Sequence, residues 1–208
     1  MGHKVAKSDG LLQLSMTKKL LTTVLAISSA VWAADCVPSG SRAKPSVASP
    51  DGRYHVLNVF CANQADGRVL VLRSVKSGER RTLYTYERDA SVLWSPDSRR
   101  IAINDYAGSD YTNNIVVSID RDASPIDLKK RLLQSKPKQD VLESDHLYLS
   151  ARGWKSESEI ELIAWGHDSE RKKGFCRCFL MSLQGSIQQC RLPAEGADRE
   201  EYCDKIKK

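Results

Sequence analysis

The sequence predicts an all-β fold of antiparallel, blade-like meanders with one short helix. Short runs rich in Val, Ile, Leu and Tyr alternate with turn signals such as Asp66-Gly67 and Ser77-Gly78. β-Branched and aromatic residues favour strands, whereas such dipeptides favour turns. A Ser-Pro-Asp phrase also occurs twice, beginning at Ser49 and Ser95, each time before a strand-like run. A phrase that recurs in this way indicates a repeated structural unit.

Residues 1–33 have the pattern of an N-terminal extension followed by a secretory signal peptide. Two lysines precede an uncharged, mostly apolar run, residues 20–30, and a small residue ends the segment at Ala33. The run is too short to span a bilayer comfortably, and Asp35 argues against lipid attachment at the cysteine that follows it. We therefore expect cleavage after Ala33, a periplasmic or secreted product without a stable membrane anchor, and a single β-rich domain over residues 34–208.

The charge pattern does not favour a nucleic-acid partner. Loss of the leader removes four lysines and one aspartate, which lowers the formal net charge from +6 to +3. The densest basic clusters, residues 129–131 and 171–173, are short and fit a solvated face or a loop. We expect no binding to nucleic acid.

Six strands are predicted in the first part of the domain. Residues 34–47 are rich in Pro, Ser and Gly, so we expect an extended lead-in, with order beginning near Pro50. Short turns between the runs favour antiparallel hairpins. The predicted strands are Tyr54–Phe60, Arg68–Val75, Thr82–Tyr86, Val92–Trp94, Arg100–Tyr106 and Asn114–Ile119.

One helix is expected to interrupt the strands. Residues 124–127 combine an N-cap serine, a proline at the first helical position and an acid three residues after the cap. Leu128 and Leu132 then share one face, and the helix is expected to end before Pro137. The polar stretch 135–144 predicts a surface loop.

Four further strands bring the expected total to about ten, and a polar, charged tail follows them. These strands are His146–Ala151, Ile160–Trp165, Phe175–Leu183 and Ser186–Cys190.

All six cysteines lie beyond the predicted cleavage site, and export makes disulfides the expected state. A hairpin around Gln184-Gly185 places Cys178 opposite Cys190, and the other pairs are the simplest completion. A thiolate metal site on Cys176 and Cys178 is the alternative, although Cys-x-Cys lacks the spacing typical of structural zinc. The expected disulfides are Cys178–Cys190, Cys176–Cys203 and Cys36–Cys61.

The two Ser-Pro-Asp turns lie 46 residues apart, about the length of a four-stranded blade, and residues 154–163 form a weaker third copy. The phrase W-S-P-D-x-R-R-I-A-I, residues 94–103, resembles the WD40-like repeat of bacterial periplasmic β-propellers of the TolB type. The resemblance implies blades that open with this turn. About ten strands make two and a half blades, fewer than closure usually needs. We therefore expect a partial or small β-propeller, or two packed sheets.

The loop from Asp105 to Asn114 carries the densest set of polar and aromatic side chains. Residues 104–114 also resemble a loop of small exported bacterial proteins, which implies no activity. Calcium binding is an alternative on the oxygen donors, including Thr112, but the order of an EF-hand loop is absent. Trp94 and Trp165 are expected to pack in the core, and the tyrosines suit a binding rim. The candidate binding residues are Asp105, Tyr106, Ser109, Asp110, Tyr111 and Asn113.

No catalytic motif is visible. His55, His146 and His167 lie far apart in the sequence, and there is no G-x-S-x-G elbow or Gly-rich phosphate loop. We therefore expect an exported, non-catalytic binding or structural module that recognises a protein or glycan partner and needs no cofactor or metal. The alternative is a periplasmic hydrolase whose site is built from loop residues such as Asp105, Asp110 and His167.

Overall fold

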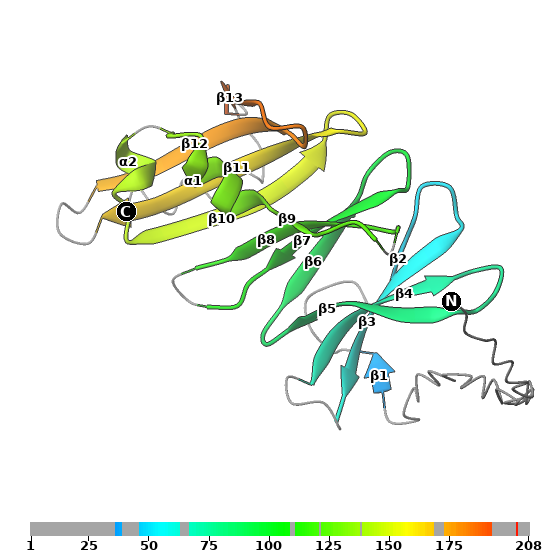
Figure 1. Ribbon diagram of the computed structural model, residues 1–208. Helices are drawn as coiled ribbons and strands as arrows, with labels where there is room; N and C mark the ends of the chain where they lie inside the picture. Colours follow the sequence, from blue (N-terminus) through cyan, green and yellow to red (C-terminus); the bar gives the residue numbers. More distant parts are fainter. Residues whose placement is uncertain are drawn as a thin grey trace, which may run out of the picture. The chain divides into compact units, whose positions relative to one another are not determined.

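The computed structural model contains three antiparallel sheets in which strands that follow one another along the chain pair with one another (Figure 1). This all-β, blade-like arrangement confirms the predicted fold class. Within the described residues there are thirteen strands, so the sequence underestimated their number. The structure describes residues 36–38, 46–62, 67–108, 111–120, 122–137, 139–168, 173–192 and 203, all within the unit Ala33–Lys208.

The first sheet has five strands. Both β1 and β2 pair with β3 along the same edge, β1 near its end and β2 near its start. Order therefore begins before Pro50, contrary to the prediction, because two segments of the lead-in complete this edge. The strands are β1 (Cys36–Pro38), β2 (Ser46–Ala48), β3 (Tyr54–Cys61), β4 (Arg68–Ser74) and β5 (Arg80–Tyr86).

The second and third sheets are four-stranded meanders. In the second sheet the strands are β6 (Ala90–Trp94), β7 (Arg100–Asp105), β8 (Asn113–Ser118) and β9 (Ile126–Asp127). In the third sheet they are β10 (His146–Trp154), β11 (Glu159–Asp168), β12 (Lys173–Ser182) and β13 (Ile187–Cys190). The expected strands are all present, with ends shifted by a few residues.

The predicted helix begins later than expected. Ile126 pairs with Val116 in β9, so the chain stays extended through Asp127. Asp127, rather than Ser124, then caps α1 (Leu128–Gln134), and its carboxylate accepts a hydrogen bond of 2.8 Å from the backbone N–H of Lys130. A second helix, α2 (Gln139–Leu142), lies in the stretch predicted as a loop.

Leu128 and Leu132 of α1 are fully buried, as their spacing predicted. They pack in a core with residues of β10, β11 and β12, and this core covers one face of the third sheet. A separate core joins the first and second sheets around Val56, Trp94 and Ile101. Each neighbouring pair of sheets thus buries its own apolar layer.

The two Ser-Pro-Asp turns have the same hydrogen bonds. The Ser49 hydroxyl donates to Asp51 at 2.7 Å, and the Ser95 hydroxyl donates to Asp97 at 2.5 Å. The backbone N–H of Arg53 and the Ser49 hydroxyl lower the pKa of Asp51 to about 2. The repeated phrase therefore predicts a repeated turn, which places the following strand in each sheet.

Tryptophans that begin these phrases join one sheet to the next. The indole N–H of Trp94 donates to the Val47 carbonyl at 3.2 Å, and that of Trp154 donates to the Leu93 carbonyl at 3.1 Å. The weak third copy of the repeat is therefore structurally equivalent at its tryptophan. Trp94 is buried, as predicted.

The three expected disulfides are all present, with no free cysteine in the described residues. Residues Cys178 and Cys190 are cross-strand partners in β12 and β13, as the predicted hairpin requires. The described residues include no helix that is long and apolar enough to cross a membrane. The disulfides are Cys36–Cys61, Cys176–Cys203 and Cys178–Cys190.

Candidate functional site

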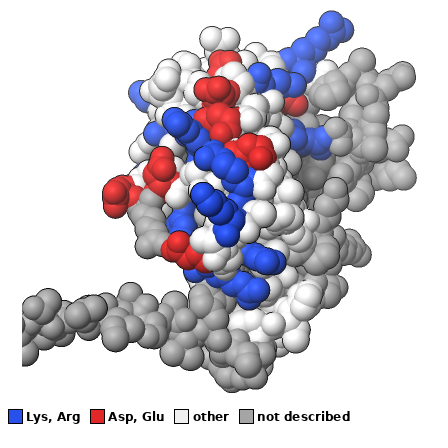
Figure 2. Space-filling view, turned by 90° about the vertical axis from the view of Figure 1, so that its right-hand side faces the viewer, with Lys and Arg blue, Asp and Glu red and all other residues white. Residues whose placement is uncertain are grey.

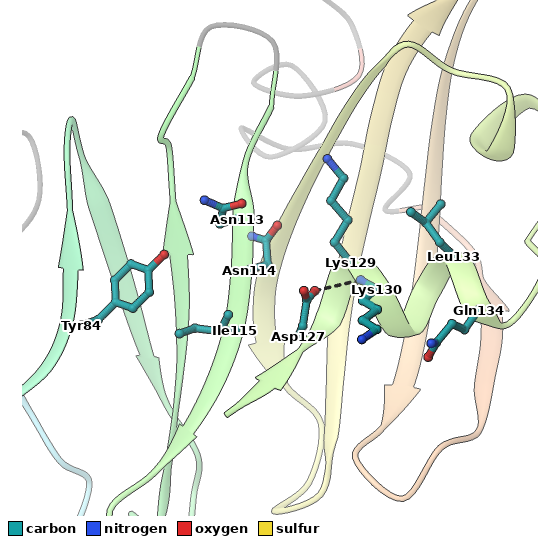
Figure 3. Close-up of a pocket in the computed structure, with 9 residues that line it drawn as sticks. All are labelled: Tyr84, Asn113, Asn114, Ile115, Asp127, Lys129, Lys130, Leu133 and Gln134. Atoms are coloured by element: carbon teal, nitrogen blue, oxygen red, sulfur yellow. Dashed lines mark hydrogen bonds between the residues drawn. The ribbon is translucent and has the colours of Figure 1, made fainter. Parts of the chain in front are cut away.

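A cavity of about 590 Å³ lies where β5, β8, β9 and α1 meet, and we call it the α1 cavity (Figure 3). Its volume lies in the range that suits small ligands. Side chains from the first sheet, the second sheet and the helix contribute to it. Its lining residues are Tyr84, Asn113, Asn114, Ile115, Asp127, Lys129, Lys130, Leu133 and Gln134.

Asp105 at the end of β7 holds two of these lining residues. The Tyr84 hydroxyl donates to Asp105 Oδ2 at 2.8 Å, and the Asn113 amide donates to the same oxygen at 3.3 Å. Asp105 itself is only 3% exposed, and its Oδ1 atom has no hydrogen-bond partner among the described residues. A buried carboxyl oxygen without a donor is costly.

This environment shifts two pKa values. Burial raises the pKa of Asp105 above its ordinary value, and the hydrogen bonds from Tyr84 and Asn113 oppose the shift only in part. Burial, together with the bond to Asp105, raises the pKa of Tyr84. The phenol therefore keeps its proton and acts as the donor at neutral pH.

We expect Asp105→Asn to flatten the pH dependence of stability. A raised folded-state pKa means that Asp105 stabilises the fold most below pH 3.8, and this contribution is lost as the pH rises through the folded-state value. Asparagine keeps an acceptor for Tyr84 but does not ionise, so the variant should be at least as stable as wild type at pH 7. Urea unfolding from pH 3.5 to 8 measures this, and an equal decline in both proteins would contradict it.

The opposite wall of the cavity is basic. Lys129 donates to the Leu147 carbonyl at 3.1 Å, whereas Lys130 is exposed and forms no ion pair with the described residues. The Asp127 carboxylate lies between this wall and β8, where it caps α1. The helix side of the cavity therefore carries two ammonium groups and one carboxylate.

The predicted binding loop divides into different environments. Asn113 lines the α1 cavity and Asp105 lies directly behind it, so these two predicted residues are brought together. Tyr106 is half-buried and Tyr111 is 43% exposed, and neither lines the cavity. The remaining predicted residues, Ser109 and Asp110, lie outside the described residues.

Two oxygen donors considered for calcium have a structural role instead. The Thr112 hydroxyl donates to the Leu149 carbonyl and accepts from the Leu149 N–H, both at 2.8 Å. Asn114 donates to Asn104 at 2.9 Å. Both side chains are buried, and Asn114 also lines the α1 cavity. Across the described residues, no group of three or more His, Cys, Asp or Glu side chains is arranged to hold a metal ion.

The histidines that are far apart in the sequence are partly paired. His146 and His167 are cross-strand partners in the third sheet, and their rings stack with centroids 4.4 Å apart. Trp165 stacks on Tyr148 on the next rung. Its side chain is half-buried and belongs to neither apolar core, so the predicted place in the core is met only in part. Residues 146, 148, 165 and 167 share a face of the sheet, because alternate residues point the same way.

Sequence reasoning did not find Tyr84, Lys130 or Gln134. Lys130 belongs to a short basic cluster, a pattern typical of solvated surface, and Tyr84 lies in an ordinary strand pattern. Their role depends on the tertiary arrangement that brings residues of β5, β8 and α1 around one cavity. A local signal for this arrangement is absent from both segments.

On the face seen in Figure 2, acidic side chains lie directly beside basic ones, in keeping with the interspersed charges of the sequence.

A second cavity of about 520 Å³ lies between the first and second sheets. Its lining is mostly apolar and includes Val47, Val56, Leu70 and Leu93, together with Asn58 and Ser91. It offers few groups that fix the orientation of a polar ligand.

The sequence matches no family model and no curated protein. Similar solved structures include the β-propeller domain of the Trilobed protease from Pyrococcus furiosus, with 13% identity and a TM-score of 0.48 over 71% of this chain and 43% of that one. An acylaminoacyl peptidase from Pyrococcus horikoshii has 13% identity and a TM-score of 0.43, over 68% of this chain and 24% of that one. A TolB structure from Agrobacterium tumefaciens has 16% identity and a TM-score of 0.38, over 72% of this chain and 50% of that one. The chain spans half or less of each structure.

Proposed function

We propose that this chain is an exported, non-catalytic binding module that holds a glycan in the α1 cavity. One observation carries the proposal: the cavity combines amide, phenol and ammonium groups on its walls with an apolar surface from Ile115 and Leu133. Sugars present hydroxyl groups at their edges and C–H groups on their faces, so they match both kinds of surface. A few polar groups that fix orientation within an otherwise apolar pocket are typical of ligand sites.

The concave shape favours a glycan over a protein partner. A stable protein interface usually buries about 800 Å² on each partner and is centred on aromatic or arginine anchors. The α1 cavity instead encloses a volume suited to a few sugar units and has one aromatic residue, Tyr84, in its lining.

Export is supported by the signal-peptide pattern and by three disulfides. Disulfides form and persist mainly in oxidising compartments such as the periplasm and the exterior.

A hydrolase is the second candidate, and the raised pKa of Asp105 is the observation that favours it. Glycoside hydrolysis usually requires two carboxyl groups on either side of the scissile bond. Asp127 is the one carboxylate that lines the α1 cavity, and it already accepts a hydrogen bond from the backbone N–H of Lys130 at the start of α1, whereas Asp105 lies behind Asn113. His167 lies in the third sheet, stacked on His146, and does not line the cavity. Binding without turnover is therefore the expected behaviour.

We expect Gln134→Trp to abolish glycan binding by filling the α1 cavity. Gln134 lines the cavity and is exposed, so a larger side chain fits there without disturbing the core. Binding to an array of bacterial and plant glycans, followed by calorimetry on each hit, measures the effect. A loss of at least tenfold is expected.

Gln188→Trp is the matched control, because Gln188 is also exposed but lies on β13, outside the cavity lining. It should bind glycans as wild type does. Equal binding by both variants, or the absence of any glycan hit for wild type, would contradict the proposed function. Release of reducing sugar from a bound glycan would instead support the hydrolase.

A further inference from the structure

Asp105 sets the polarity of one wall of the α1 cavity. The Tyr84 hydroxyl and one N–H of the Asn113 amide donate to this buried carboxyl group. The Asn113 amide has two ends, so when its nitrogen faces Asp105 its oxygen faces away. Figure 3 shows this oxygen on the side that faces α1. The wall formed by Tyr84 and Asn113 therefore offers oxygen atoms that accept hydrogen bonds. It suits a ligand group that donates a hydrogen bond, such as a sugar hydroxyl.

The helix wall has the opposite character. Lys129 and Lys130 are followed by Gln134 one turn later, and all three line the cavity. The Lys129 ammonium donates one hydrogen bond to the Leu147 carbonyl. Lys130 has no carboxylate partner among the described residues. Asp127 is the one carboxylate among the lining residues, so the formal charges of the lining side chains sum to +1. The helix wall therefore suits a ligand group that accepts hydrogen bonds and carries a negative charge.

We propose that the α1 cavity selects acidic glycans, with sugar hydroxyls donating to the Asn113 and Tyr84 wall and a uronate carboxylate accepting from Lys130. This inference rests on the proposed function and names its ligand class. A neutral sugar satisfies only the first wall. A carboxylate on the sugar ring satisfies both, since ammonium–carboxylate hydrogen bonds are stronger than neutral ones.

The test compares acidic oligosaccharides with their methyl esters. Trimers of galacturonate, glucuronate and mannuronate, each with its fully esterified form, are titrated into the mature protein by calorimetry. Esterification removes the charge but keeps the sugar backbone. We expect at least one acid to bind ten or more times as tightly as its ester. Raising the salt from 50 to 300 mM should weaken binding of the acid severalfold and leave the ester unchanged.

Two variants assign the preference to Lys130. Lys130→Met should bring the affinity for the acid down to that for the ester, because it removes the charge from an exposed side chain. Lys76→Met changes the net charge equally, but Lys76 is exposed between β4 and β5, away from the cavity, and this variant should keep the preference.

The outcomes separate the two proposals. Equal affinity for acid and ester in wild type, or an acid preference that survives Lys130→Met, would overturn the inference. If neutral glycans then still bind and Gln134→Trp removes that binding, the proposed function stands without it. If no acid, ester or neutral glycan binds, both proposals are wrong.

Discussion

Replacing Asn104 with alanine is expected to lower the free energy of unfolding by about 3 to 5 kcal/mol. The Asn104 side chain is 2% exposed and joins the second sheet to the third. Its oxygen accepts from the Ala151 N–H at 2.8 Å, and its nitrogen donates to the Ala151 carbonyl at 3.0 Å. Ser91 and Asn114 supply its other two hydrogen bonds. Alanine leaves several buried polar groups without partners, each costing about 1 to 3 kcal/mol.

The matched control is Asn113→Ala. Asn113 is exposed and has one long hydrogen bond to Asp105, so its loss should cost less than about 1 kcal/mol. Urea unfolding of both variants, followed by circular dichroism, measures the difference. A loss below 1 kcal/mol in Asn104→Ala would show that the carboxamide does not hold the two sheets together.

The second large effect is expected at Gly166 in β11. A Cβ atom built there overlaps the backbone carbonyl oxygen of His146 and crowds the Ser144 hydroxyl. Ser144 donates to the carbonyls of His146 and His167, so the crowded atoms belong to a hydrogen-bonded end of the hairpin. Because backbone cannot move aside as a flexible side chain does, Gly166→Ala should destabilise the protein by about 3 kcal/mol.

Gly153→Ala provides the comparison within the same pair of strands. Nothing lies within 4 Å of a Cβ atom at Gly153, and its φ is not positive, so the change should stay within about 0.5 kcal/mol of wild type. The melting temperatures of the two variants, measured by thermal unfolding, test this difference in stability. Similar melting temperatures for both would mean that β10 and β11 separate at this end more easily than the structure indicates.

Local patterns predicted most of the strands and all three disulfides. The Cys178–Cys190 pair followed from the hairpin register, because residues that face one another across two strands are fixed by the turn between them. The predicted start of the helix was wrong because Ile126 pairs with Val116 in β9. The capping pattern at Ser124 does not reveal this contact. Tertiary pairing overrode the local preference there.

The candidate site was predictable only in part. Asp105 and Asn113 were named as candidates because a polar loop between two strands is a common position for binding residues, and the structure brings these two side chains together beside the cavity. Tyr84 and Lys130 come from segments that reach the same cavity as Asn113 only in the folded chain. The calcium alternative counted Thr112 among its oxygen donors, but the Thr112 hydroxyl forms hydrogen bonds with the backbone of β10. Composition alone does not distinguish a side chain that binds a ligand from one that forms hydrogen bonds with the backbone.

Hydrogen–deuterium exchange of the mature protein, with and without a saturating glycan, tests the location of the binding site most directly. Exchange slows where a ligand covers or orders the backbone. If the α1 cavity is the site, protection should appear in residues 113–115 of β8 and 128–134 of α1, and the third sheet should exchange unchanged. Protection confined to residues 146–148 and 165–167, where the stacked rings of the third sheet lie, would contradict the account.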